Sequence, residues 1–215
     1  MNSLIVSGGT VEGDFINKVI KNAGFDLIIA ADSGIDILYE IGVTPDVIVG
    51  DFDSANQIVL DCYSRNEMVE FVELNPIKDE TDTESAIRIA IAKNSKCITI
   101  IGGTGSRIDH VLGNISLLGI GLERGVDIFI LDPNNKIRMI DKDLTLKKKE
   151  QYGRYISLIP YGGDVEGLTL NGMKYPLSNY KMGGFNSLGI SNEIVDDTAV
   201  ITLKKGVLLV IESRD

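Results

Sequence analysis

Short apolar runs alternate with amphipathic stretches through the first part of the chain, from residue 4 to residue 131. Each run has the length and the Val, Ile and Leu content of a buried strand, and between the runs apolar residues recur at helical spacing. This alternation is typical of a parallel sheet with crossover helices. We therefore expect an N-terminal α/β domain of three layers, with a largely parallel sheet between helices. The strands are expected at residues 4–6, 26–31, 47–49, 68–72, 97–101 and 127–131.

Two of the expected helices have informative ends or faces. Thr81 and Glu84 form the pattern of a capping box, which starts a helix that runs to Lys93. The next helix follows Arg107 and has two distinct faces. One face carries the apolar residues Ile108, Val111, Leu112, Ile115, Leu118 and Leu122, and another carries Arg107, His110 and Asn114.

The pattern changes after residue 135, where short and often alternating runs replace the helical period. Turn pairs such as Gly162-Gly163 and Lys205-Gly206 separate the runs, which is typical of antiparallel strands. We expect a C-terminal all-β sandwich domain over residues 135–215, after the α/β domain over residues 1–134. Its strands are expected at residues 136–140, 144–148, 155–159, 165–170, 200–203 and 207–211.

The composition narrows the classes of function. The 215 residues carry a formal charge of −10, so a nucleic-acid backbone or an anionic membrane surface is a poor partner. Cys62 and Cys97 are the only cysteines, too few for a disulfide scaffold or a thiolate zinc site. The N-terminus has no basic region, and no signal peptide or membrane-spanning apolar run is visible. We expect a cytoplasmic protein with no membrane or nucleic-acid partner.

Two carboxylates follow the apolar run at residues 47–49, in the stretch Gly50-Asp51-Phe52-Asp53-Ser54. Side chains two apart on an extended backbone point to the same side, about 7 Å from each other. Asp51 and Asp53 therefore repel each other unless a cation lies between them. Mg²⁺ prefers oxygen ligands of this kind and also holds substrate phosphates. The alternative is a polar turn, since Asp, Gly and Ser all favour turns.

The other polar and glycine-rich clusters of this domain also follow expected strands. Ligands of parallel sheets bind beyond the carboxyl ends of the strands, so all these clusters are expected at one edge of the sheet. Their convergence favours the metal-site interpretation of the two carboxylates. The clusters are Ser7-Gly8-Gly9, Asp32, Asn75 to Asp82, and Gly102 to Arg107.

The glycine-rich segment Gly102 to Ser106 precedes the helix that follows Arg107. Free N–H groups and the helix dipole at such a point can hold phosphate, and the Arg107 guanidinium can bind phosphate oxygens through two hydrogen bonds. An ordinary strand-to-helix turn is the alternative. Asp109 and His110 could orient each other, a ligand or the water shell of a metal, although a lone histidine is often structural.

Asp79 and Asp82 flank the start of the helix capped by Thr81. Asp82 is explained by its place in the first turn, where the helix dipole favours a negative charge. The presence of both acids beside Lys78, at the edge where the other clusters converge, favours contact with a ligand. The sequence contains no phosphate-binding loop that ends in Gly-Lys-Ser/Thr. The suggested chemistry is direct transfer organised by a metal.

Several motifs occur in an order that resembles the thiamin pyrophosphokinase family. Gly-Asp-Phe-Asp-Ser and Arg-x-Asp-His together are specific, and the resemblance covers nearly the whole chain. In the last quarter it rests on Leu168, Gly172 to Leu177 and Gly189 to Glu193. The earlier motifs are Asp32-Ser33-Gly34, Pro45-Asp46 with Gly50 to Ser54, Lys78 to Asp82, and Gly102-Gly103 with Arg107 to His110.

The resemblance implies transfer of the terminal diphosphate of ATP to the hydroxyethyl group of thiamin, with Mg²⁺ and with release of AMP. It also implies a homodimer in which thiamin lies where the α/β domain of one subunit meets the sandwich of the other. Carried over to matching positions, Asp51, Asp53 and Asp79 or Asp82 hold Mg²⁺. The implied ATP contacts are Asp32, Ser33, Gly102, Gly103, Thr104, Gly105, Ser106 and Arg107.

The implied thiamin contacts are Asp82, Tyr175, Ser191 and Asn192. Tyr175 stands where animal members of the family have tryptophan, and its ring can still stack on a cationic thiamin ring. The full set expected to take part in catalysis is Asp51, Asp53, Asp79, Asp82, Arg107, Asp109 and His110.

Two other functions fit the same residues. One is a metal-dependent phosphotransferase or hydrolase that acts on another alcohol or nucleotide. The other is a thiamin- or nucleotide-binding sensor without turnover. The acidic cluster argues against the sensor, because binding an anion needs no such concentration of carboxylates unless a metal joins them.

Overall fold

The computed structural model describes residues 1–52, 56–75 and 80–215. The chain divides into two compact units, Met1–Pro133 and Asn134–Asp215. The first unit has parallel strands and helices, whereas the second has antiparallel strands in two sheets. The expected fold class, α/β followed by an all-β sandwich, is therefore confirmed. Within the described ranges, no helix is long and apolar enough to cross a membrane.

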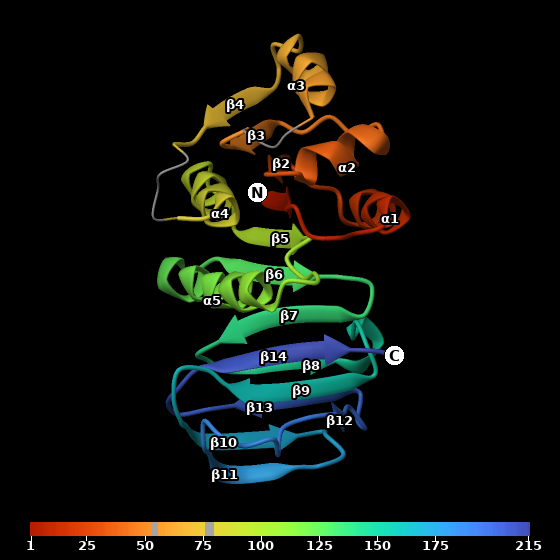
Figure 1. Ribbon diagram of the computed structural model, residues 1–215. Coiled ribbons are helices and arrows are strands. Elements are labelled where there is room, and N and C mark those ends of the chain that lie inside the picture. The colour runs from red at the N-terminus through yellow and green to blue at the C-terminus, as the bar shows by residue number, and fades with distance from the viewer. Residues whose placement is uncertain (53–55, 76–79) are drawn as a thin grey trace. The chain divides into compact units, whose positions relative to one another are not determined.

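The first unit is built on a parallel sheet in the strand order β6-β5-β1-β2-β3-β4. Each neighbouring pair in this order runs parallel (Figure 1). The strands are β1 (Asn2–Val6), β2 (Leu27–Ala31), β3 (Val47–Gly50), β4 (Glu70–Glu73), β5 (Cys97–Ile101) and β6 (Asp127–Leu131).

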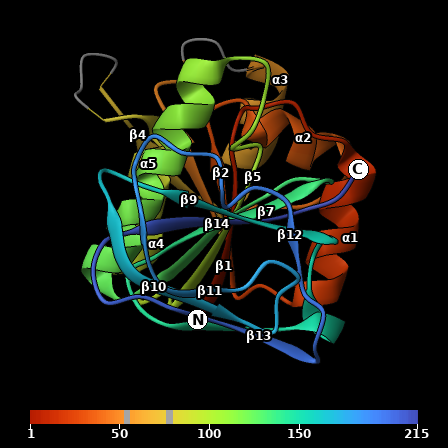
Figure 2. The ribbon, with the colours of Figure 1, turned by 90° about the horizontal axis from the view of Figure 1, so that it is seen from below.

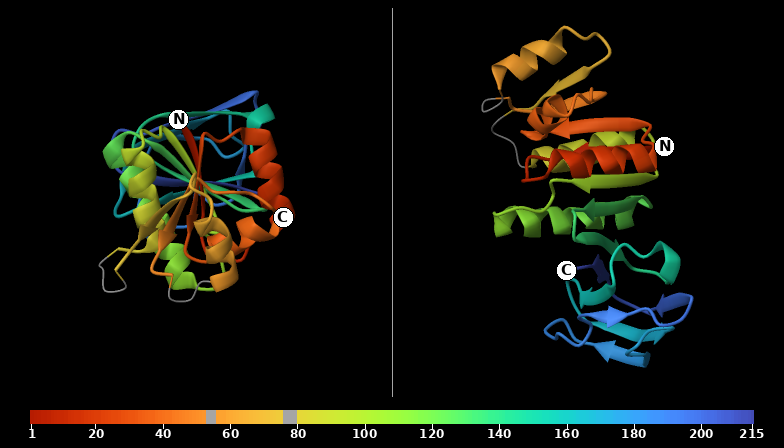
Figure 3. Two further views of the ribbon diagram at one scale, coloured as in Figure 1. Left: turned by 90° about the horizontal axis from the view of Figure 1, so that it is seen from above. Right: turned by 90° about the vertical axis from the view of Figure 1, so that its right-hand side faces the viewer.

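Helices cover both faces of this sheet, which gives the expected three layers. The helices α1, α2 and α3 lie on one face, and α4 and α5 lie on the other (Figures 2 and 3). Because the chain moves outward from β1 to β4 and then crosses back to β5, the strand order reverses between β1 and β5. Such a reversal point is where open parallel sheets bind ligands. The helices are α1 (Gly13–Ala23), α2 (Gly34–Glu40), α3 (Gln57–Ser64), α4 (Asp82–Ala92) and α5 (Ile108–Arg124).

The central strands are apolar on both faces, as a parallel sheet covered on both sides requires. Leu4, Ile5, Ile29, Ile48 and Ile98 are completely buried. Burying an aliphatic side chain of this size stabilises the fold by about 1.5–3 kcal/mol. The helices are therefore held by the sheet, and the strand ends are fixed with it.

One local expectation in the first unit was wrong, and another was only partly right. Ile108 and Leu112, on the expected apolar face of α5, are 66% and 59% exposed, and the buried positions are Leu118 and Gly121. A helix of this length spans about 25 Å, whereas a five-residue strand spans about 17 Å. The first turns of α5 therefore extend beyond the strands that would bury them.

The capping box at the start of α4 is only half formed. Thr81 Oγ1 accepts a hydrogen bond from Glu84 N at 3.2 Å, as expected. The Glu84 carboxylate does not return this bond, because it pairs with Arg88 one turn further on at 2.6 Å. Thr81 thus supplies the side-chain cap of this helix.

The second unit consists of two antiparallel sheets, β12-β9-β14-β7 and β11-β10-β13-β8. Both sheets contribute to one core that includes Ile156, Leu168, Met182, Ile201 and Val210. The strands are β7 (Asn135–Ile140), β8 (Leu144–Lys147), β9 (Tyr155–Pro160), β10 (Val165–Asn171), β11 (Leu177–Met182), β12 (Asn192–Glu193), β13 (Thr198–Thr202) and β14 (Leu208–Ser213), with a short 3₁₀ helix at Lys148–Glu150.

The strands β11 and β12 were not expected from the sequence. In β11 every residue between Leu177 and Met182 is exposed, so no buried alternation marks the strand. It is an edge strand that pairs only with β10 in its sheet. β12 has two residues, which is too short for any periodic signal.

Candidate active site

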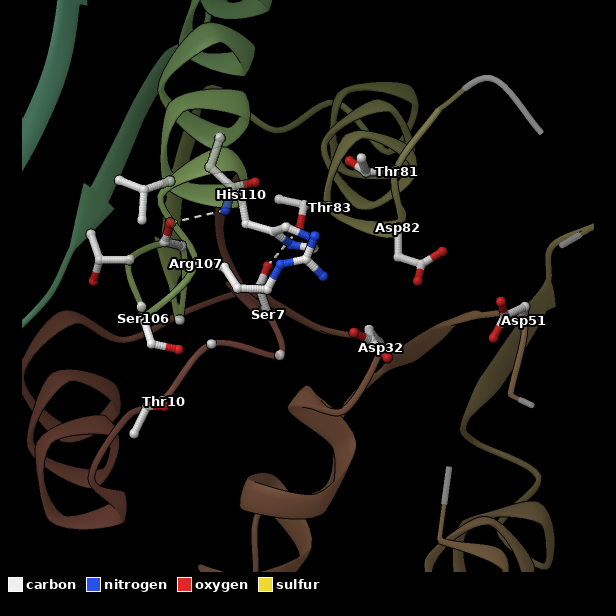
Figure 4. Close-up of a pocket in the computed structure, with 18 residues that line it drawn as sticks. Ser7, Thr10, Asp32, Asp51, Thr81, Asp82, Thr83, Ser106, Arg107 and His110 are labelled. Atoms are coloured by element: carbon white, nitrogen blue, oxygen red, sulfur yellow. Dashed lines mark hydrogen bonds between the residues drawn. The ribbon is translucent and has the colours of Figure 1, made fainter. Parts of the chain in front are cut away.

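A cavity of about 400 Å³ opens at the carboxyl edge of the first unit, around the point where the strand order reverses. Glycine loops after β1 and β5 form one side, and acidic residues after β2 and β3 form another (Figure 4). The lining residues are Ser7, Gly8, Gly9, Thr10, Asp32, Asp51, Thr81, Asp82, Thr83, Gly102, Gly103, Thr104, Gly105, Ser106, Arg107, His110, Val111 and Asn114.

The two glycine loops interlock through their backbones. Ser7 N donates to Ile101 O at 2.8 Å, and Gly9 N donates to Gly102 O at 3.1 Å. A Cβ atom on Gly9 would lie 2.2 Å from Gly102 O, and Gly102 itself has a φ of +76°. Side chains are therefore excluded at the contact, and bare backbone lines this side of the cavity.

The second loop offers backbone donors to the cavity. In the part of the chain that the structure describes, the N–H groups of Thr104, Gly105 and Ser106 donate to no backbone carbonyl. Arg107 is the N-cap of α5, and its side chain does not cap the helix. Unmet N–H groups and the positive end of a helix dipole favour an anion. The expected phosphate loop, Gly102 to Arg107, is thus gathered at the cavity.

Arg107 and Asp109 form a pair at the mouth of this loop. Arg107 Nη2 lies 2.6 Å from Asp109 Oδ2, and Arg107 Nε donates to Asp109 Oδ1 at 3.2 Å. The bond from Arg107 holds the pKa of the Asp109 carboxyl below its usual range, and both side chains are exposed. Asp109 does not line the cavity, whereas His110 does. The Asp109 carboxylate, which lies outside the cavity, therefore fixes the Arg107 guanidinium beside the cavity.

The acidic side of the cavity carries Asp32, Asp51 and Asp82, which come from three separate segments (Figure 4). Burial raises the pKa of the Asp32 carboxyl, and the charges of Asp82 and Asp51 raise it further. The backbone bond from Ser33 and the charge of His110 act in the opposite direction. Carboxylate oxygens are the ligands that Mg²⁺ prefers, and a divalent cation would relieve the repulsion between these charges.

Two of the expected metal ligands, Asp53 and Asp79, lie outside the described residues. Among the described residues, no group of three or more Asp, Glu, His or Cys side chains is close enough to hold a metal. Phe52, between the two carboxylates in sequence, has a φ of +59° and packs edge-on against Phe71 at 6.0 Å. Its ring thus belongs to the packed side of the turn.

The turn after β2 is shaped by packing as well as by chemistry. Asp32 has a φ of +54°, and its N–H donates to Val49 O at 3.1 Å. α2 begins at Gly34, where a Cβ atom would lie 2.0 Å from Val6 O. Ser33, an expected ATP contact, does not line the cavity, and its hydroxyl donates to Gly8 O at 3.4 Å. Ser33 therefore supports the first glycine loop.

Sequence reasoning placed some of the lining at the right edge without assigning it to the site. Ser7-Gly8-Gly9 was recognisable as a glycine pair after a strand, and Asn114 shares a helix face with His110. Nothing in the sequence indicated that Thr83 lines the cavity, because its hydroxyl is positioned by Ser7, which is distant in the sequence. The lining residues absent from the expected set are Ser7, Gly8, Gly9, Thr10, Thr81, Thr83, Val111 and Asn114.

The expected thiamin contacts of the second unit lie together around Tyr175. Asn192, which is buried, accepts from Tyr175 N at 3.0 Å and donates to Tyr175 O at 2.9 Å. Ser191 has a φ of +57°, and its N–H donates to Ser157 Oγ at 3.0 Å. The Tyr175 ring is 59% exposed, and Lys174 Nζ lies 5.6 Å from its centre. Asn192 thus clamps the backbone of an exposed aromatic residue.

Two family models match this chain, one for each unit. Residues 16–130 match the catalytic domain of thiamin pyrophosphokinase, and residues 142–208 match its vitamin B1 binding domain. The first describes a domain that carries out catalysis and the second a domain that binds the vitamin, which defines a two-domain enzyme. The chain belongs to the thiamin pyrophosphokinase family. The resemblance expected from the sequence motifs is confirmed.

Individual relatives agree with the family models. The chain is 35% identical to a thiamine pyrophosphokinase of Bacillus subtilis (strain 168) over 193 residues, which cover 88% of each chain. The crystal structure of a thiamine pyrophosphokinase from Bacillus subtilis superposes with a TM-score of 0.87 at 33% identity and covers all of both chains. That of a thiamin pyrophosphokinase from Geobacillus thermodenitrificans gives 0.86 at 30% identity, over 100% of this chain and 98% of the other.

Proposed function

We propose that this chain is a Mg²⁺-dependent thiamin pyrophosphokinase, which transfers diphosphate from ATP to the thiamin hydroxyl and releases thiamin diphosphate and AMP. One observation carries the proposal within this family: the cavity has backbone donors on one side and carboxylates on the other. A polyphosphate requires both sides, because hydrogen-bond donors and a cation bound by carboxylates must together neutralise its charge.

The residues divide by chemistry. Asp51, with Asp53 and Asp79, is assigned to Mg²⁺, and Asp82 lies at the same side of the cavity to hold the metal or the thiamin alcohol. When bound, Mg²⁺ neutralises the charge of the diphosphate group and orients it. The N–H groups of the second glycine loop and the Arg107 guanidinium hold the phosphate chain.

The reaction then depends mainly on positioning. The thiamin hydroxyl oxygen forms a bond to the β-phosphorus, the bond from that phosphorus to the bridging oxygen of AMP breaks, and the hydroxyl proton passes to solvent. Arg107 and His110 face the cavity and can meet the negative charge that gathers on the phosphate oxygens. Asp109 acts on this step through the guanidinium that it holds.

For the vitamin, we propose that the Tyr175 ring stacks on thiamin, with Ser191 beside it and Asn192 clamping the backbone of Tyr175. As the family resemblance implies, a homodimer would complete this site with the α/β domain of the partner subunit. Phe185 is fully exposed, and Leu188 and Ile190 are about half exposed in the same loop region. Apolar surface of this kind supports burial against a second copy. Use of ATP and a content of only two cysteines fit a cytoplasmic enzyme.

One assay tests the proposed reaction. The purified chain is incubated with Mg²⁺, ATP and thiamin, and the nucleotide product is identified, with EDTA as the metal-free control. AMP and thiamin diphosphate in equal amounts support the proposal. ADP or phosphate would point to another phosphotransferase or a hydrolase. Tight binding without any product would point to a sensor.

A further inference from the structure

Asn114 joins the second turn of α5 to the glycine loop that precedes this helix. Its Nδ2 donates to Gly103 O at 2.9 Å, across eleven positions of sequence. The bond is partly buried, and Asn114 itself lines the cavity. The side chain thus fixes a peptide group at the wall of the cavity.

The other contacts of this segment anchor the loop on the side that precedes the Gly103–Thr104 peptide. A Cβ atom on Gly103 would lie 3.1 Å from Ile130 and 3.3 Å from Ile100, so the sheet packs closely beneath it. On the preceding side, Gly102 O accepts from Gly9 N. The loop is anchored up to Gly103, and Asn114 holds the carbonyl where the anchored part ends.

A trans peptide places its C=O and the following N–H on opposite sides. When Asn114 holds Gly103 O toward α5, it therefore turns the Thr104 N–H away from Asn114. Thr104 N–H is one of the loop N–H groups that donate to no backbone carbonyl in the described chain. The amide of Asn114 thus sets the direction of this donor.

We infer that Asn114 is a positioning residue for the phosphate chain of ATP and that it acts by fixing the Gly103–Thr104 peptide plane. The inference rests on the proposed function in taking ATP as the ligand. Asn114 would thus affect phosphate binding through the Gly103–Thr104 peptide and not through a direct contact with the phosphates. Loss of the amide frees the peptide plane and disperses the donors, whereas the adenosine part of the ligand loses nothing.

The test compares Asn114→Leu and Asn114→Asp with the wild type. Leu keeps the approximate size but removes the donor, and Asp keeps the shape but places an acceptor against Gly103 O. We expect the KM for ATP to rise about tenfold in Asn114→Leu, and more in Asn114→Asp, with the KM for thiamin unchanged. Ser116→Ala is the matched control on the same helix, because the Ser116 hydroxyl donates to Leu112 O. It should leave both KM values unchanged.

A second readout separates phosphate positioning from a general loss of structure. Adenosine and ATP are titrated calorimetrically against each variant with Mg²⁺ and without thiamin. We expect weaker binding of ATP and unchanged binding of adenosine. Equal losses for both ligands, or no loss for ATP, would overturn the inference. Because this readout needs no turnover, a wild type that binds ATP but makes no thiamin diphosphate would refute the proposed function alone.

Discussion

The hydroxyl groups of Ser7 and Thr83 lie 2.9 Å apart at the floor of the cavity. Ser7 directly follows β1 and is 4% exposed, and Thr83 is the second residue of α4 and is 9% exposed. The bond joins the first glycine loop to the helix start that carries Asp82. The glycine-loop side and the acidic side of the cavity are therefore fixed relative to each other.

The first prediction concerns this bond. Thr83→Val keeps the shape of the side chain but leaves the buried Ser7 hydroxyl without this partner, so the free energy of unfolding should fall by about 1–3 kcal/mol. Adding Ser7→Ala should cost less than it does in the wild type, because both partners are then gone. Urea unfolding of the four proteins in a double-mutant cycle measures the coupling, which we expect to be about 0.5–2 kcal/mol. Strictly additive losses would contradict the bond.

Asp51→Asn should abolish turnover and leave the fold intact. The amide keeps the size of the side chain but loses the charge that attracts Mg²⁺, and a metal contribution of several kcal/mol corresponds to about a thousandfold or more in kcat. Asp53→Asn should behave in the same way. Asp61→Asn, at an exposed position of α3, is the control and should be fully active. Steady-state rates as a function of Mg²⁺ concentration check this, and normal rates in both variants would refute the metal assignment.

Asp32 should make the empty protein less stable at neutral pH. Because burial raises the pKa of Asp32 in the folded chain above 3.8, its favourable contribution is complete at pH values below 3.8 and is lost as the pH rises through the raised pKa. Asp32→Asn should therefore raise the Tm of the ligand-free protein at pH 7, and the gain should shrink toward pH 3.5. Asn also tolerates the positive φ of this position.

Thermal unfolding across this pH range, without Mg²⁺, measures the effect of Asp32→Asn. Added Mg²⁺ should reverse the order, because the cation stabilises the wild-type carboxylate. A gain in Tm that is the same at every pH would show that the charge of Asp32 is not its cause.

The buried Glu212 should be a main stabilising residue of the second unit. It is 2% exposed, and its carboxylate accepts from Arg138 Nη2 at 2.9 Å and from Tyr152 N at 2.8 Å. Glu212→Ala should cost about 3–5 kcal/mol, because it leaves a largely buried guanidinium without this carboxylate. Glu150→Ala breaks the exposed pair with Lys147 and should cost no more than about 1 kcal/mol. Urea unfolding monitored on both variants checks the contrast, and similar losses would contradict it.

Replacement of Tyr175 should change the KM for thiamin and leave the KM for ATP unchanged. A cation–π contact is worth about 0.5–2 kcal/mol, so Tyr175→Ala should raise the KM for thiamin by about 2- to 30-fold. Tyr175→Trp should match or improve on the wild type, since tryptophan presents the stronger ring. Tyr180→Ala, on the exposed strand β11, is the control. Initial rates at varied thiamin and fixed ATP decide the matter, and an unchanged KM in Tyr175→Ala would exclude the stacking.

The alternation of strands and helices was readable from the sequence because most strands of the first unit carry a short apolar run, although β4 (Glu70–Glu73) does not. The position of the site followed from it, since polar residues after parallel strands must meet at one edge. The exposed face of α5 at Ile108 was not readable, because the helix pattern does not say how far the sheet extends. The bonds of Thr83 and Asn114 were not readable either, since each joins segments whose contact only the folded chain creates.

Gly34 stands so close to Val6 O that no larger residue fits there, although its motif also carries a carboxylate of the cavity. Selection for a well-packed backbone would keep this glycine in a descendant that had lost all activity. The glycine of the Asp-Ser-Gly signature therefore traces ancestry more faithfully than it traces turnover. An inactive homologue would be recognised by the loss of its acidic residues and not by the loss of its glycines.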